Sequence, residues 1–71
     1  MLTAAQIIEY AERVIAEDRL SGNRAGLRNT QLACGFLMAA ANAAGDRETA
    51  TRFRNLAALA ANRNEELGDD R

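Results

Sequence analysis

One unbroken apolar stretch, Leu32 to Ala41, constrains the fold of this chain more than any other feature. At helical spacing its residues are apolar around the whole circumference, which indicates a helix covered on every side rather than along one stripe. The stretch is too short to span a bilayer. In a 71-residue chain that contains no proline, we therefore expect it to form the central helix of one small all-α domain.

Local start and stop signals divide the chain into three helices. Thr3 followed by Gln6 forms a capping box that predicts a helix over about 4–20, and Ser21-Gly22 supplies its end. Gly45 and Asp46 end a second helix and cap a third, so we expect helices over about 27–44 and 47–67 in an antiparallel bundle. Residues 68–71 are predicted to be a polar tail.

Composition limits what such a domain can do. Nine basic and ten acidic residues give a net charge of −1, so there is no overall positive field to hold nucleic acid or an anionic membrane. Histidine is absent, and the one cysteine, Cys34, lies inside the apolar stretch, where we expect a small buried hydrophobe. No catalytic or metal-ligating constellation is visible. We therefore expect a non-enzymatic cytoplasmic protein with no cofactor and no metal.

Sixteen of the hydrophobic residues are alanine, so the predicted core is thin. Because a domain this small has no disulfide pair to stabilise it, we expect self-association into a homo-oligomer. Gly35, Ala39 and Ala43 are spaced four apart, which lets another backbone approach closely. The predicted self-association surface consists of Gly35, Phe36, Leu37, Met38 and Ala39, and copies of the chain are expected to help enclose the central helix.

A polar segment from Gly22 to Thr30 precedes this helix and contains two glycines. Free backbone N–H groups at a helix start attract phosphate, the guanidinium groups of Arg24 and Arg28 can bind its oxygens, and Thr30 can donate a hydroxyl. Tyr10 can stack on a base. The alternative is that both arginines are solvated or paired with acidic side chains of the first helix and that Asn23 is a cap; those acids are Glu12, Glu17 and Asp18.

The same region resembles the second helix of the phage anti-CBASS sponge proteins, whose signature there is roughly Thr-x-Leu-x-x-Gly-Phe-Met. The resemblance covers about eighteen residues and rests on Gly22, Leu27, Thr30, Leu32, Gly35-Phe36 and Leu37-Met38-Ala39. It implies a non-enzymatic homo-oligomer that sequesters a cyclic oligonucleotide immune signal in the host cytosol. Thr30 is the polar position that matches the signature; Asn29 replaces the lysine common before it, and the third helix departs from the family pattern.

Two other classes of function fit the same residues. The helices can form a rigid surface that blocks a host defence complex or a host regulator, as anti-CRISPR proteins do. A small DNA-binding unit would place Arg28, Asn29 and Gln31 at the start of a recognition helix. That helix is too apolar to lie in a DNA groove, so we expect a small ligand or a host protein as the partner and not a nucleic acid polymer.

Overall fold

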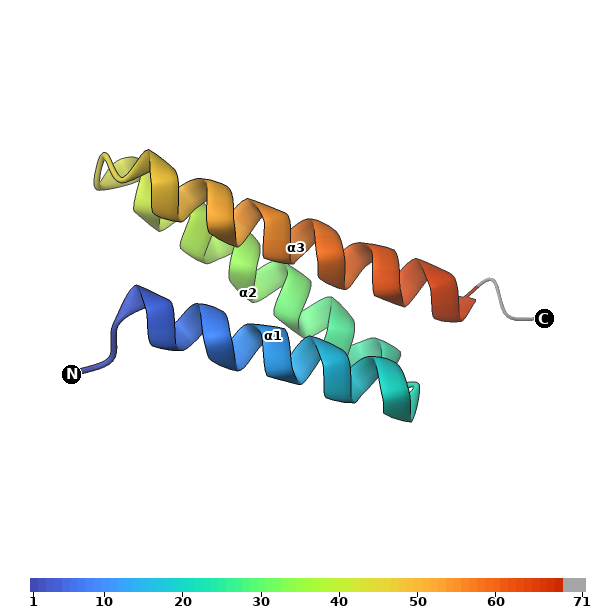
Figure 1. Cartoon of the computed structure of the whole chain (residues 1–71). Helices are drawn as coiled ribbons and strands as arrows, with labels where there is room; N and C mark the ends of the chain where they lie inside the picture. Colours follow the sequence, from blue (N-terminus) through green and yellow to red (C-terminus); the bar gives the residue numbers. More distant parts are fainter. Residues whose placement is uncertain (69–71) are drawn as a thin grey trace.

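The computed structural model describes residues 1–68 and consists of three helices, α1 (Ala4–Ser21), α2 (Arg24–Ala43) and α3 (Arg47–Gly68), joined by short turns (Figure 1). No strand occurs in this range. α2 runs antiparallel to both α1 and α3. The predicted all-α, three-helix architecture is therefore confirmed. Of the predicted polar tail, Gly68 belongs to α3, and residues 69–71 lie outside the described part.

The ends of α1 follow from local side-chain and backbone chemistry. The N–H of Gln6 donates to Oγ1 of Thr3 at 3.2 Å, and the N–H of Thr3 donates to Oε1 of Gln6 at 2.9 Å, which completes the capping box. At the other end Gly22 has φ 72°, a left-handed conformation that glycine adopts without strain. The predicted limits of the first helix are correct to within one residue.

The second helix begins three residues earlier than the prediction of 27. Oδ1 of Asn23 accepts a hydrogen bond from the N–H of Gly26 at 3.0 Å and so caps the helix at Arg24. A Cβ on Gly26 would collide with the side chain of Asp18, so this glycine permits close packing rather than a flexible loop. The polar loop expected from 22 to 30 is thus reduced to Gly22 and Asn23, because residues 24–30 are helical.

The turn between α2 and α3 was predicted correctly. Gly45 has φ 81°, and the carboxylate of Asp46 accepts a hydrogen bond from the N–H of Thr49 at 3.1 Å. The carbonyl of Asp46 accepts the first helical bond, from the N–H of Ala50, also at 3.1 Å. Hydrogen bonds from the side chain and then the backbone of Thr49 lower the pKa of Asp46. Asp46 is therefore a charged N-cap that suits the positive end of α3.

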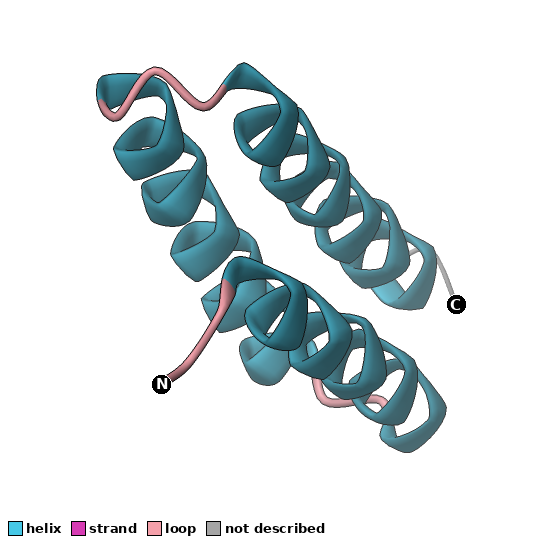
Figure 2. Ribbon diagram, turned by 60° about the vertical axis from the view of Figure 1, so that its left-hand side comes forward, coloured by secondary structure: helices cyan, strands magenta, loops and turns pink. Residues whose placement is uncertain are grey.

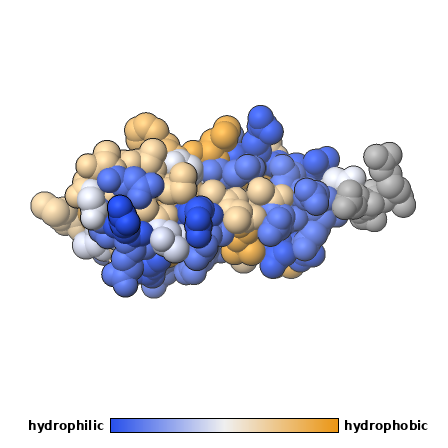
Figure 3. Space-filling view, turned by 90° about the horizontal axis from the view of Figure 1, so that it is seen from above, coloured by the Kyte–Doolittle hydropathy of each residue, from blue (hydrophilic) through white to orange (hydrophobic). Residues whose placement is uncertain are grey.

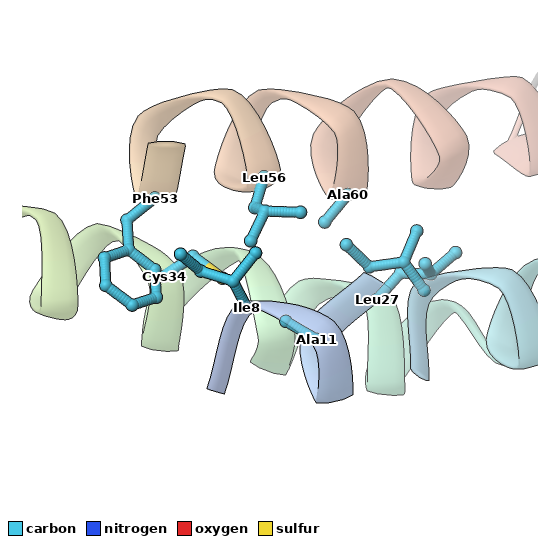
Figure 4. Packing of buried hydrophobic residues seen from close by; sticks show 8 residues of the cluster. Ile8, Ala11, Leu27, Cys34, Phe53, Leu56 and Ala60 are labelled. Atoms are coloured by element: carbon cyan, nitrogen blue, oxygen red, sulfur yellow. The ribbon is translucent and has the colours of Figure 1, made fainter. Parts of the chain in front are cut away.

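The core is a single row of apolar side chains to which all three helices contribute (Figure 4). Leu27 is 0 % exposed and Cys34 is 2 % exposed. Cys34 is thus the small buried hydrophobe that the sequence predicts, and burial raises the pKa of its thiol. No buried polar residue is present among the described residues. The buried cluster consists of Ile8, Ala11, Ile15, Leu27, Cys34, Phe53, Leu56 and Ala60.

The bundle is elongated and thin, with principal extents of 43 × 21 × 15 Å. α2 and α3 form a hairpin, whereas the N-terminal end of α1 diverges from the turn that joins them (Figures 1 and 2). One side of α2 therefore stays uncovered, with Leu32 59 % exposed and Phe36 75 % exposed. A single chain thus covers only part of the circumference of α2, and the expectation that copies of the chain cover the rest stays a prediction.

Candidate functional site

A groove of about 380 Å³ lies between α1 and α2. This volume is within the usual range of ligand pockets, roughly 300–1,000 Å³. Most of its wall is apolar, and α1 and α2 contribute to it in nearly equal parts. The apolar side chains and the thiol that line the groove are Ile7, Tyr10, Ala11 and Val14 of α1 and Ala33, Cys34 and Leu37 of α2.

The polar part of the groove comes from residues near the α1–α2 turn. The polar side chains that line it are Asp18 of α1 and Asn29 and Thr30 of α2. The charged side chain of the lining is that of Asp18. Nδ2 of Asn23 donates to Oδ1 of Asp18 at 3.4 Å, which is a long and weak hydrogen bond. The carboxylate of Asp18 therefore keeps most of its capacity to accept hydrogen bonds. A partner that presents a cation or an N–H donor there suits the groove better than an anion does.

The structure brings two of the four predicted ligand-binding residues together. Tyr10 and Thr30 both line the α1–α2 groove, whereas Arg24 and Arg28 do not. Tyr10 is 61 % exposed, and the guanidinium carbon of Arg13 lies 5.6 Å from the centre of its ring, within cation–π range. One neighbour of the ring is thus a cation that the sequence reasoning did not consider.

Arg24 and Arg28, the two arginines of the predicted ligand-binding site, have different surroundings. Nε of Arg24 donates to Oδ1 of Asn64 on α3 at 2.8 Å, so this side chain joins two helices. Arg28 is exposed, and no ion pair involves it within residues 1–68. The acidic residues of α1 named as alternative partners hold neither arginine in an ion pair in this range.

A second cleft, of about 330 Å³, lies between α1 and α3 and includes Arg19 and Arg63 in its wall. Glu66 forms salt bridges with both, to Nε of Arg19 at 3.0 Å and to Nη1 of Arg63 at 2.9 Å. Because Glu66 shares its charge between these two cations, the cleft offers an anion less positive charge than its arginine content suggests. Each ion pair is about half exposed and contributes little to stability.

A smaller pocket, of about 170 Å³, lies between α2 and α3 near their turn. It is lined by Met38 and Asn42 of α2 and by Arg47, Ala50, Thr51 and Arg54 of α3. The hydroxyl of Thr51 donates to the carbonyl of Arg47 at 3.0 Å. The sequence reasoning overlooked this cluster, although the spacing of Arg47, Thr51 and Arg54 at i, i+4 and i+7 places all three on one helix face.

No group of three or more His, Cys, Asp or Glu side chains converges within residues 1–68 in a way that could hold a metal ion. In the same range no helix is both long enough and apolar enough to cross a bilayer.

Comparison of the chain with protein-family models, with curated proteins and with solved structures gives no match. The chemistry of the α1–α2 groove therefore follows from the residues that line it. It is the largest of the described pockets and has the most apolar wall, and the α2–α3 pocket is the one in which arginines gather without an acidic lining residue.

Proposed function

We propose that this protein is a non-catalytic binding protein whose α1–α2 groove holds an apolar helix of a partner protein. The observation that carries the proposal is the groove wall, which combines several apolar side chains with a single carboxylate, that of Asp18. An amphipathic helix laid into an apolar groove is a recurrent mode of protein recognition. On this proposal the protein acts as an inhibitor that occupies such a helix on a host defence complex or a host regulator.

The groove also defines the chemistry of the partner helix. Ile7 and Val14 on one wall and Ala33 and Leu37 on the other favour apolar partner side chains at i, i+3 or i+4, and i+7. Asp18 favours a lysine or arginine at the end of the helix that lies near the α1–α2 turn. Tyr10 supplies a large, partly exposed aromatic side chain at the edge, the residue type that often dominates binding energy at interfaces.

Site-specific photo-crosslinking tests this proposal. With Tyr10 replaced by benzoylphenylalanine, irradiation in a bacterial lysate should yield an adduct whose cross-linked peptide is identified by mass spectrometry as an amphipathic helix with a basic end. The same replacement at Arg52, an exposed position on α3, is the matched control and should yield no such adduct. Introducing Val14→Glu into the Tyr10 variant should abolish the adduct. Equal labelling at both positions, or no adduct at Tyr10, would overturn the proposal.

A second candidate function is sequestration of a phosphorylated ligand such as a cyclic oligonucleotide. The observation in its favour is the α2–α3 pocket, where Arg47 and Arg54 offer two guanidinium groups beside the amide of Asn42. Tyr10 and Thr30 line the α1–α2 groove, but no cationic side chain does. On this proposal the phosphates bind at α3, and Arg24, Arg28 and Thr30 are not the main contacts.

Calorimetry against a panel of cyclic di- and trinucleotides tests the second candidate. Arg54→Ala should weaken binding at least tenfold, whereas Arg28→Ala should leave it unchanged. Loss of binding in Arg28→Ala alone would instead return the phosphate site to the start of α2. Absence of heat across the whole panel would remove the sequestration proposal.

A further inference from the structure

We propose that two copies of this chain associate through the uncovered side of α2 in an antiparallel, twofold-symmetric dimer. This side, called here the outer face of α2, consists of Leu32, Gly35, Phe36, Ala39 and Ala43. The two large side chains are mostly in contact with solvent in the single chain, Leu32 at 59 % and Phe36 at 75 % exposure. Burial of a phenylalanine or leucine side chain contributes about 1.5–3 kcal/mol, so the solitary chain leaves this contribution unused.

The outer face carries no charge. The charged residues of α2 are Arg24 and Arg28, both in its first two turns, and no charged residue occurs from Leu32 to Gly45. Two such faces can therefore meet without burying or juxtaposing like charges. Figure 3 shows apolar surface at the tip and along one side of the end where α2 turns into α3, next to strongly hydrophilic residues on the other side of the same end.

The shape of the face makes it complementary to itself. A Cβ placed on Gly35 would meet nothing within 4 Å, so no contact inside the chain requires a glycine there. Yet a glycine within a helix costs about 1 kcal/mol relative to alanine. Gly35, Ala39 and Ala43 form a row of small residues next to Phe36. A twofold axis perpendicular to α2 would place Phe36 of each copy over the small-residue row of the other, as an isologous interface requires.

The chain exposes more surface than a compact monomer of its mass would. A compact monomer of 7.7 kDa has an accessible surface of roughly 4,300 Å², whereas this chain exposes 5029 Å². The excess is about 700 Å²; it belongs to the whole elongated bundle and not to α2 alone. The radius of gyration, 12.4 Å against about 11 Å for a compact chain of this length, reflects the same elongation.

The self-association surface differs from the prediction in two residues. Leu37 and Met38 are half-buried and pack against the core of their own chain, so they are not available to a second copy to the same extent. Leu32 and Ala43 take their place, because positions 32, 36, 39 and 43 share one helix face. The second copy is the favoured occupant because the same face carries both a protruding aromatic side chain and the small-residue row that can receive it.

Sedimentation equilibrium of the purified chain tests the dimer. At tens of micromolar the wild type should have twice the mass of 7.7 kDa, and its melting temperature should rise with protein concentration. Gly35→Gln should raise the dimer dissociation constant at least tenfold while leaving the dilute monomer as stable as the wild type or more so, since the position is open and glutamine favours helix. Phe36→Ser should also give a monomer.

Leu20→Ser is the matched control, because Leu20 is 87 % exposed but lies at the end of α1, away from the outer face. It should remain dimeric. A wild type that stays monomeric at millimolar concentration, or a Gly35→Gln variant that associates as tightly as the wild type, would overturn the proposal. Val14→Glu, which blocks the α1–α2 groove, should remain dimeric, so failure of the dimer and failure of the proposed partner binding are separate results.

Discussion

Nε of Arg24 donates a hydrogen bond to Oδ1 of Asn64, 2.8 Å away, and so links the first turn of α2 to the last two turns of α3. The guanidinium group also lies beside Gly68, at the C-terminal end of α3. A cation is favoured there by the negative end of the helix dipole. Arg24 therefore has a structural role at the end of the bundle where α1 turns into α2.

Removal of this side chain should cost stability. We expect Arg24→Ala to lower the free energy of unfolding by about 0.5–1.5 kcal/mol, because it removes a hydrogen bond from a charged donor and a cation at the end of α3. Urea denaturation followed by circular dichroism measures the change. Arg28→Ala, the control, removes an exposed arginine on the same helix and should change stability by less than about 0.5 kcal/mol. Equal losses in both variants would contradict this role.

Asp46 should make stability depend on pH in the acidic range. Its pKa in the folded chain is lower than the ordinary value of about 3.9, so the folded state binds protons less readily than the unfolded state does. The stabilisation is thus fully present above about pH 5 and is lost as the pH falls through the folded pKa. Melting temperatures at pH 7, 5, 4 and 3 should show an acid loss that is smaller in Asp46→Asn, whose amide also caps a helix but does not titrate.

Cys34 should be unreactive while the chain is folded. The thiol is buried and its pKa is raised, so little thiolate is present at neutral pH and a reagent cannot reach it. Labelling with a disulfide reagent at pH 8 should be slow in buffer and fast in urea. Cys34→Ser should destabilise the fold by about 1–3 kcal/mol through an unpaired buried hydroxyl, and Cys34→Ala by less. Rapid labelling of the native protein would show that the core opens here.

Leu27 should be the most sensitive leucine of the chain. It is fully buried in the first turns of α2, and a leucine-to-alanine change at such a site costs about 2–5 kcal/mol. We expect Leu27→Ala to unfold a large fraction of the protein at 25 °C, as judged by the helical signal in circular dichroism. Leu20→Ala changes the same residue type at an 87 % exposed position and should leave that signal intact. Similar losses of helical signal in the two variants would contradict the burial of Leu27 in the core.

Much of the fold was predictable because the helix ends depend on local chemistry. The capping box of Thr3 and Gln6, the left-handed Gly22 and the Gly45-Asp46 junction each involve residues within a few positions of one another. The start of α2 was not predicted, because Gly26 suggested a loop. The helix start is in fact set by the local cap of Asn23, whereas the glycine at position 26 has a tertiary reason, since Asp18 of α1 occupies the space where a Cβ would lie.

The candidate site was less predictable than the fold. A helix apolar on all sides does not indicate which side its own chain covers, and that choice depends on how α1 diverges from the α2–α3 hairpin. Tyr10 and Thr30 share a groove for this reason, although nothing in the sequence pairs them. The bond of Arg24 to Asn64, forty positions away, cannot be inferred from local spacing, so the sequence leaves open whether this arginine binds an anion or a group of its own chain.

The divergence of α1 also has a consequence for the order in which the protein opens. α2 and α3 pack against each other along the hairpin, so α1 can detach by local unfolding while that pair remains associated. Backbone amides of α1 should accordingly exchange with deuterium sooner than those of α3. Such partial opening would expose the apolar sides of α2 and α3 that Ile8 and Ile15 shield in the folded chain.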